Sequence, residues 1–244
     1  MFGNVASKRE ITLAVPVQLP TSLRNESYGG VTYHIEGELV PPVLHLELAQ
    51  VPAYFEHHVL LWKDPTVQIG VKTLSGAFKR TFSGMPIFMT EAKGPGRIAF
   101  SRDGVGHVFP IHLRPGEAID VREHQFLAAT ANVDYSFTWT KGVSNMLFGG
   151  TGLFIDRFSC PHEEEVLWLH GCGNVFEMRL EAGEQIDIEP GGWVHKDLSV
   201  KIQTQFQRLS TGFLASASQI FWNRFTGPGR VGLQSMCLLV PTTT

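Results

Sequence analysis

Apolar and polar residues alternate over many short stretches of this chain, and glycine or proline bounds most of them. Clear examples are VLHLEL at 43–48, GHVFPIHL at 106–113 and NVFEMRL at 174–180. A period of two residues is typical of a β-strand with one buried face. No long stretch keeps the 3.6-residue period of a helix, so the pattern predicts an all-β fold with at most a short helix.

Turn-like tripeptides recur at a constant spacing along the chain. They are Gly94-Pro95-Gly96, Cys160-Pro161-His162 and Gly227-Pro228-Gly229, at steps of 66 and 67 residues. A Gly-Glu-Xaa-Ile-Asp motif occurs at 116–120 and again at 183–187, also 67 residues apart. Agreement of several residue types at one spacing indicates an internal repeat, in which neighbouring units complete each other's core.

Large apolar residues recur in the same frame. Val67, Val133 and Val200 close the three units, and a phenylalanine precedes each tripeptide by six residues. These aromatic residues are Phe88, Phe154 and Phe221. We expect them to be core residues, a reading that we favour over an aromatic binding stripe.

The repeat predicts three β-sandwich modules with pseudo-threefold symmetry. We expect modules at about 70–139 and 140–206, and a third made of 207–241 plus 30–69, so that the chain ends jointly complete one module. Residues 30–241 are then a single domain. Residues 1–29 are an N-terminal extension, in which ITLAVPVQL at 11–19 has the pattern of an extra strand.

Composition excludes several classes of protein. The 244 residues are 43% hydrophobic and 18% charged, which is typical of a soluble globular protein and not of a disordered one. The net charge is −3 and no basic run exceeds two residues, so we do not expect nucleic acid as a partner. We also expect no transmembrane segment, because the N-terminal apolar stretch is short and broken by proline.

Three cysteines, Cys160, Cys172 and Cys237, are an odd number and argue against a secreted disulfide framework. With no signal-peptide pattern at the N-terminus, we expect a cytoplasmic protein.

Several of these segments resemble one known family. GGTGLFIDRF at 149–158 and FWNRFTGPGRVGLQS at 221–235 look like diagnostic segments of the mitochondrial biogenesis family, named for altered inheritance of mitochondria. FKRTFSGMPIFMTEAKGPGRIAF at 78–100 and LEAGEQIDIEPGGWV at 180–194 resemble two more of its segments. The resemblance covers roughly residues 31–240. It implies a fold similar to the trp RNA-binding attenuation protein, and it brings no catalytic residues with it.

One group of residues has metal-binding chemistry. Cys160 and His162 precede the stretch VLWL, and His170 and Cys172 follow it. Thiolate and imidazole ligands suit tetrahedral zinc, and a hairpin could bring the two pairs together. The ligand spacing within each pair is shorter than usual, so we favour structural roles for all four residues.

Other patterns of catalytic residues are weaker. The sequence contains no His-Xaa-His pair, which a cupin-type metal centre would need. It also contains no nucleophile elbow and no phosphate-binding loop. Arg97 and Arg230 could present a guanidinium to an anion, but their recurrence favours structural turns. Asp120 and Asp187 also recur, and we interpret them as bonding carboxylates, since an acid/base pair needs two different environments.

The sequence therefore predicts a non-enzymatic scaffold or binding protein that self-associates as a homo-oligomer and docks a protein partner of unknown identity. We expect no cofactor, no catalytic residues and no metal ligands. The alternative is a small-molecule or metal-binding protein with its site between modules or at Cys160–Cys172.

Overall fold

The computed structural model describes residues 14–37, 41–72, 89–102, 104–140, 153–208 and 219–236. Within these residues nearly all regular structure is β, and the helical part is one 3-10 turn, η1 (His57–Val59). The prediction of an all-β fold is confirmed. The side chains of Phe88, Phe154 and Phe221 lie outside the described residues, as does Cys237.

From β4 onward, the described strands fall into three consecutive sets of six, which we call the first, second and third units. The first unit contains β4 (Val43–Leu48), β5 (Ala53–Glu56), β6 (Leu60–Lys63), β7 (Gln68–Lys72), β8 (Met89–Lys93) and β9 (Gly96–Phe100). The second contains β10 (Gly106–Leu113), β11 (Ala118–Arg122), β12 (Phe126–Thr130), β13 (Asp134–Thr140), β14 (Leu153–Ser159) and β15 (Glu165–Cys172). The third contains β16 (Val175–Leu180), β17 (Gln185–Ile188), β18 (Trp193–Asp197), β19 (Lys201–Arg208), β20 (Gln219–Thr226) and β21 (Gly229–Gln234).

Each unit repeats one pattern of strand pairing. The sixth strand lies between the first and the third, as in β4-β9-β6, and the fifth lies between the second and the fourth, as in β5-β8-β7. The third strand of every unit also has a register shift at the same place, before Trp62, Ala128 and His195. The sequence repeat is therefore a repeat of strand pairing, in which two small sheets face each other.

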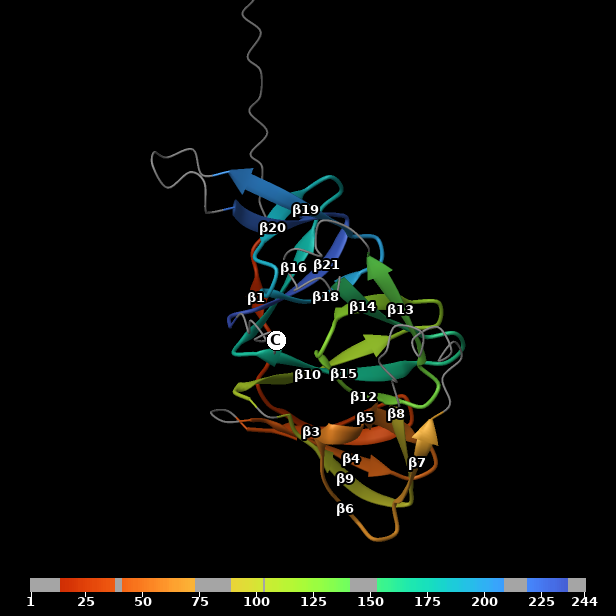
Figure 1. The fold of residues 1–244 in the computed structure, drawn as a ribbon. Coiled ribbons are helices and arrows are strands. Elements are labelled where there is room, and N and C mark those ends of the chain that lie inside the picture. The colour runs from red at the N-terminus through yellow and green to blue at the C-terminus, as the bar shows by residue number, and fades with distance from the viewer. Residues whose placement is uncertain are drawn as a thin grey trace, which may run out of the picture.

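Neighbouring units share their sheets. Strand β12 of the second unit pairs with β5 of the first, and β18 of the third pairs with β11 of the second. Three further described strands precede the first unit: β1 (Val17–Gln18), β2 (Leu23–Tyr28) and β3 (Val31–Glu36). The described strands form sheets of five (β2-β3-β4-β9-β6), six (β10-β15-β12-β5-β8-β7), seven (β1-β16-β21-β18-β11-β14-β13) and three (β17-β20-β19). Figure 1 shows these four layers following one another along the molecule, with β6 and β9 at one end and β19 and β20 at the other.

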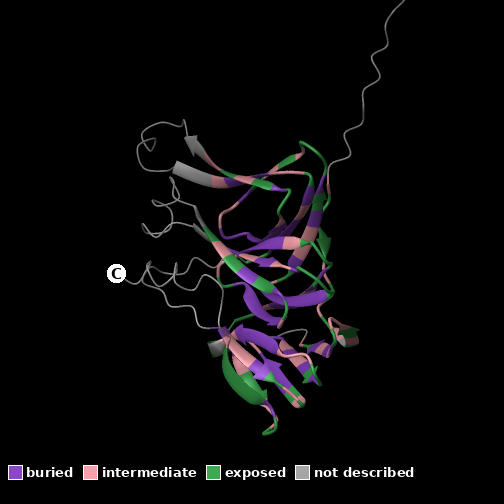
Figure 2. Cartoon of the chain, turned by 90° about the vertical axis from the view of Figure 1, so that its right-hand side faces the viewer, coloured by how far each residue is buried: buried purple, intermediate pink, exposed green. Residues whose placement is uncertain are grey.

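Apolar side chains fill the space between successive layers. Phe100 and Trp168 belong to the first cluster, between the sheets of five and six strands. A second cluster lies between the sheets of six and seven strands, and a third, which includes Trp193 and Phe225, lies between the sheets of seven and three. Figure 2 shows buried residues continuing through the middle of this stack.

The expected module built from both chain ends does not form among the described residues. Strands β20 and β21, within 207–241, pair with β16 to β19, whereas β3 (Val31–Glu36) and β4, within 30–69, pair with each other and with β2 and β9. A period fixes the length of a unit but not the residue at which it begins, and the structure begins each unit near residue 43, 106 or 175. The pseudo-threefold symmetry stays a prediction.

Part of the N-terminal extension belongs to the sheets. Strand β1 (Val17–Gln18) pairs with β16, and β2 (Leu23–Tyr28) pairs with β3. The extra strand is thus short, and a longer one follows it. These two strands widen two different sheets, so residues 14–28 contribute to the fold.

Candidate functional site

An open cleft of about 620 Å³ lies between the second and third units. Strands β10, β11, β16, β18 and β21 and their turns form most of it, and Tyr28 of β2 closes one side. The residues that line it are Tyr28, His112, Leu113, Arg114, Glu117, Ala118, Glu164, Arg179, Asp197, Leu198, Ser199 and Arg230.

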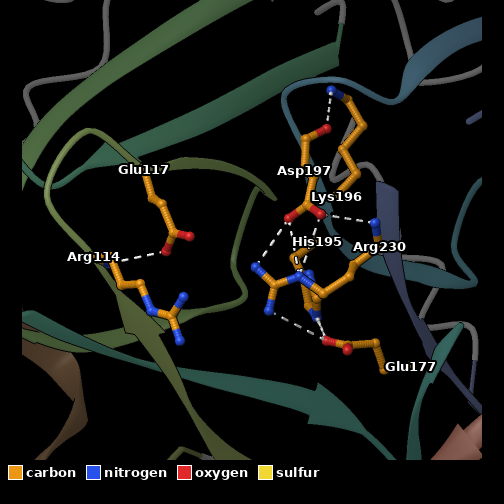
Figure 3. Close-up of polar contacts among 7 residues, drawn as sticks. All are labelled: Arg114, Glu117, Glu177, His195, Lys196, Asp197 and Arg230. Carbon is orange, nitrogen blue, oxygen red and sulfur yellow. Dashed lines mark hydrogen bonds and ion pairs between the residues drawn. The ribbon is translucent and has the colours of Figure 1, made fainter. Parts of the chain in front are cut away.

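One wall of the cleft is the turn between β10 and β11. The backbone N–H of Arg114 donates to the Glu117 carboxylate at 2.9 Å, and the N–H of Gly116 donates to the carbonyl of Cys160 at 2.7 Å. Gly116 has φ of 83°, a conformation that glycine adopts without strain. The turn uses the Glu117 side chain to bind its own backbone, and Figure 3 shows no contact between that carboxylate and the Arg114 guanidinium. Arg114 is one of the residues that line the cleft.

The opposite wall is an ion pair between β18 and β21. The backbone N–H of Arg230 donates to Asp197 at 2.8 Å, and its guanidinium donates to the same carboxylate at 3.0 Å. Glu177 of β16 lies 3.9 Å from the guanidinium on its other side (Figure 3). These contacts fix the position of Arg230 before any ligand binds.

A buried histidine lies behind this wall. His195 is fully buried, and its Nε2 is 3.8 Å from the Glu177 carboxylate. Neither of its ring nitrogens has a hydrogen-bond partner among the described residues. Burial and the nearby Arg230 lower the pKa of His195 to about 3, so the ring is neutral at physiological pH. Burial also raises the pKa of Glu177 above its usual value.

The cleft can bind polar groups of either sign. Arg114, Arg179 and Arg230 supply guanidinium groups, and Glu117, Glu164 and Asp197 supply carboxylates. Guanidinium groups bind carboxylates and phosphates through paired hydrogen bonds. Because acidic residues surround these arginines, the rim of the cleft is mixed in charge. Such a rim is better suited to binding a polar protein surface than to binding a polyanion.

The alternative metal site at Cys160–Cys172 is not assembled in this fold, for a geometric reason. Cys160 and His162 precede strand β15, whereas His170 and Cys172 lie in its last three residues. An eight-residue strand spans roughly 23 Å between its ends, so the two pairs are far apart. Strand β15 pairs with β10 and β12, and it forms no hairpin that would reunite them.

The surroundings of both cysteines favour a structural role. Each is buried, and burial raises the pKa of both thiols, which disfavours the thiolate that metals require. The N–H of Cys160 donates to the carbonyl of Glu117 at 2.9 Å, as Gly227 does to Glu184 in the third unit. The turn that begins at Cys160, where the third unit has Gly227-Pro228-Gly229, thus keeps the backbone hydrogen bonds of its counterpart.

The recurring arginines and aspartates form internal ion pairs. Arg97 donates to Asp64 as Arg230 donates to Asp197. Asp120 is bound by Arg157 at 2.7 Å, and Asp187 by an arginine in the equivalent position, Arg224, at 2.7 Å. The interpretation of these residues as bonding groups agrees with the contacts that they make.

A group that could hold a metal ion was missed by the sequence reasoning. His34 and Glu36 lie on one face of β3, and His45 stands opposite His34 on β4. The Glu36 carboxylate is 3.8 Å from Nε2 of His34 and 3.5 Å from that of His45, and the rings stack at 4.2 Å. His-Xaa-Glu in a strand was a visible signal, but His45 joins it only through strand register.

The model of one protein family, mitochondrial biogenesis AIM24, matches residues 33–236 of this chain. The chain belongs to this family. Membership confirms the resemblance seen in the sequence segments. No curated protein matches the AIM24-family chain. The described residues also contain no helix with the length and apolar character to cross a bilayer.

The fold of this AIM24-family chain is similar to that of a Streptococcus pyogenes protein solved by X-ray crystallography in a structural genomics programme. The two sequences are 20% identical, the TM-score is 0.65, and the match covers 85% of this chain and 94% of the other. At this identity the likeness establishes a shared fold.

Proposed function

We propose that this chain is a non-enzymatic scaffold or binding protein that self-associates into a homo-oligomer. One observation carries the proposal: the units of the chain are joined to each other by strand pairing. The first unit leaves its third strand, β6, at a sheet edge, and the third unit leaves its second strand, β17, at another, so that each has one neighbour among the described strands. The two ends of the stack therefore present the two kinds of strand edge that pair with each other where units join inside the chain.

Unpaired strand edges favour association because they expose backbone N–H and C=O groups. Large apolar side chains accompany the edge at β6, where Leu61 is 56% exposed and Trp62 is 39% exposed. Covering such side chains contributes roughly 25 cal/mol per Å² of apolar surface. A second copy of the chain would supply both the backbone partners and the cover.

Docking of a protein partner is the second part of the proposal. The cleft between the second and third units supports it, because three guanidinium groups and three carboxylates line a concave surface there. Interfaces between proteins are commonly mixed in charge at the rim. A cytoplasmic location for this scaffold agrees with the composition and stays an expectation.

Light scattering after size-exclusion chromatography tests the self-association. The full chain, loaded over the micromolar range, should have a mass that is a multiple of 27.1 kDa. The multiple should fall on dilution, as expected for a reversible contact. A mass of 27.1 kDa at every loading would refute the proposal.

A further inference from the structure

We infer that β6 of one copy pairs antiparallel with β17 of a second copy, with Lys63 placed opposite Asp187. This inference rests on the proposed self-association and specifies its surface. The partner is another copy of this chain, because the pairing repeats a contact that the chain already makes twice within itself.

The register follows from the two internal boundaries. Ala129 of β12 stands opposite Tyr54 of β5, and Lys196 of β18 stands opposite Asp120 of β11. Both boundaries therefore pair the same two positions of the repeated unit. On β6 the residue equivalent to Ala129 and Lys196 is Lys63. On β17 the residue equivalent to Tyr54 and Asp120 is Asp187.

The boundary between the second and third units shows what this pair does when it is formed. The Nζ atom of Lys196 donates to the Asp120 carboxylate at 2.8 Å, and each side chain is 5% exposed. Arg157 donates to the same carboxylate at 2.7 and 3.2 Å. A buried carboxylate is thus satisfied by two cations, one from its own unit and one from the next.

Both halves of this arrangement are already in place at the two ends of the stack of sheets, one on β6 and one on β17. Nζ of Lys63 lies 3.4 Å from the carbonyl of Asp64, and Nζ of Lys196 lies 3.4 Å from that of Asp197. At the other end, Arg224 donates to Asp187 at 2.7 and 2.6 Å, as Arg157 does to Asp120.

The Asp187 carboxylate lacks only the lysine. Its side chain is 36% exposed, against 5% for that of Asp120, which a lysine of the next unit covers. Lys63 of a second copy supplies the missing cation in the same geometry.

The backbone of β6 also matches the strands that form the internal boundaries. The register shift before Trp62 is the one found before Ala128 and His195, so β6 has the same bulge and presents the same edge. In the inferred register Trp62 stands opposite Ile188, which covers an indole that is 39% exposed in the single chain.

The contact joins two different edges, so it is head-to-tail. It merges the sheets of five and three strands into one of order β2-β3-β4-β9-β6-β17-β20-β19, in the way that the sheets inside the chain are built. Repetition of a head-to-tail contact gives a closed ring if the rotation closes and a filament if it does not.

Charge reversal tests the pair in the full-length chain. Lys63→Glu places a carboxylate against Asp187, and Asp187→Lys places a cation against Lys63 and Arg224. Each variant should lose assembly and have the single-chain mass of 27.1 kDa where the wild type is larger. Lys93→Glu, at an exposed lysine of β8 outside the junction, should assemble like the wild type.

Cysteine cross-linking tests the register independently of charge. Lys63→Cys and Asp187→Cys are made in separate chains that also carry Cys237→Ser, so that the remaining Cys160 and Cys172 are buried. Residues directly opposite in an antiparallel pair have Cα atoms about 4.5–5.5 Å apart, within the range of a disulfide. Mild oxidation should give a disulfide-linked dimer in the mixture and in neither chain alone.

The outcomes separate the inference from the proposed function. A wild type that stays at single-chain mass, with no cross-link, overturns both. A wild type that assembles, but whose mass is unchanged by Lys63→Glu and whose cysteine pair does not cross-link, overturns only the β6–β17 contact. Loss of assembly in both charge variants, together with the mixed cross-link, supports the contact.

Discussion

At the scale of single residues, one position of the repeated unit is occupied by two kinds of side chain. In the first and third units an aspartate, Asp64 or Asp197, accepts bonds from an arginine. In the second unit Thr130 takes this place, and its hydroxyl accepts from the N–H of Val166 at 3.1 Å. Strand β15, which carries Val166, is buried along its whole length. A charged pair would lose its hydration there, so a hydroxyl that binds only backbone suits a covered strand.

His170 should make the stability of the protein depend on pH. This side chain is 2% exposed, and burial, followed by the nearby Arg102 and His107, lowers its pKa from 6.5 to about 4. Between these values the unfolded chain binds more protons than the native one, so the free energy of unfolding rises with pH. The contribution of His170 is present above pH 6.5 and is lost as the pH falls through 4. It amounts to about 3 kcal/mol.

Urea unfolding at pH 4.5 and pH 7 measures this contribution. In His170→Gln the difference between the two pH values should shrink, because the group that titrates is gone. His162→Gln, which changes an exposed histidine, is the control and should keep the wild-type difference. Equal pH dependence in His170→Gln and the wild type would exclude the role assigned to His170.

Sequence reasoning identified residue roles better than residue partners. Asp120 and Asp187 could be interpreted as bonding carboxylates because they recur at one spacing. Their arginines could not be named, because a cross-strand neighbour depends on register, which the pattern of single strands does not contain. Lys63 was overlooked for a related reason: its counterpart Lys196 lies two repeat steps away, and the unit between them has an alanine.

At the scale of elements, the Gly-Glu turn is the best-preserved piece of the repeat. Glu117 and Glu184 each accept the backbone N–H of the residue three positions earlier, at 2.9 and 2.8 Å. Gly116 and Gly183, which precede them, have φ of 83° and 81°. A glycine, whose φ can be positive, lets the chain reverse, and the carboxylate then closes the turn.

Alanine at either glycine should cost the same free energy of unfolding. A Cβ atom added at Gly116 or Gly183 meets nothing within 4 Å, so only the backbone conformation is penalised. That penalty is about 1–2 kcal/mol for an L-residue in the left-handed region. Urea unfolding of Gly116→Ala and Gly183→Ala should show equal losses within that range.

Gly70→Ala is the matched control for this pair. Gly70 also has open space around its Cα, but it lies in a strand without a positive φ, so its replacement should leave stability unchanged or raise it slightly. Losses that differ strongly between the two turns would show that the turns are not equivalent.

The strands themselves could be predicted from alternation, whereas their grouping could not. VLHLEL, GHVFPIHL and NVFEMRL are the strands β4, β10 and β16. A period of about 67 residues is equally compatible with any starting point, and the expected start near residue 70 divided the first unit in the middle. Pairing between strands far apart in sequence decides the start, and that information lies in tertiary contacts.

At the scale of the whole molecule, each unit buries its apolar surface with the help of its neighbour. The first core cluster contains Phe55 and Phe100 of the first unit together with Val166 and Trp168 of the second. The rings of Trp168 and Tyr33 pack in a T-shaped arrangement with their centroids 5.2 Å apart. A cluster shared in this way makes the stability of one unit depend on the next, which favours a single cooperative domain.

Replacement of Trp168 tests whether residues 30–241 unfold as one domain. The indole is fully buried, so Trp168→Ala should cost about 3–5 kcal/mol of the free energy of unfolding. Because the cavity opens in a core that two units share, the whole chain should become less stable in one transition. Circular dichroism, which reports all strands, and the fluorescence of the remaining tryptophans should then have the same midpoint. If the midpoints separate, the first unit unfolds by itself, and the single-domain prediction is wrong.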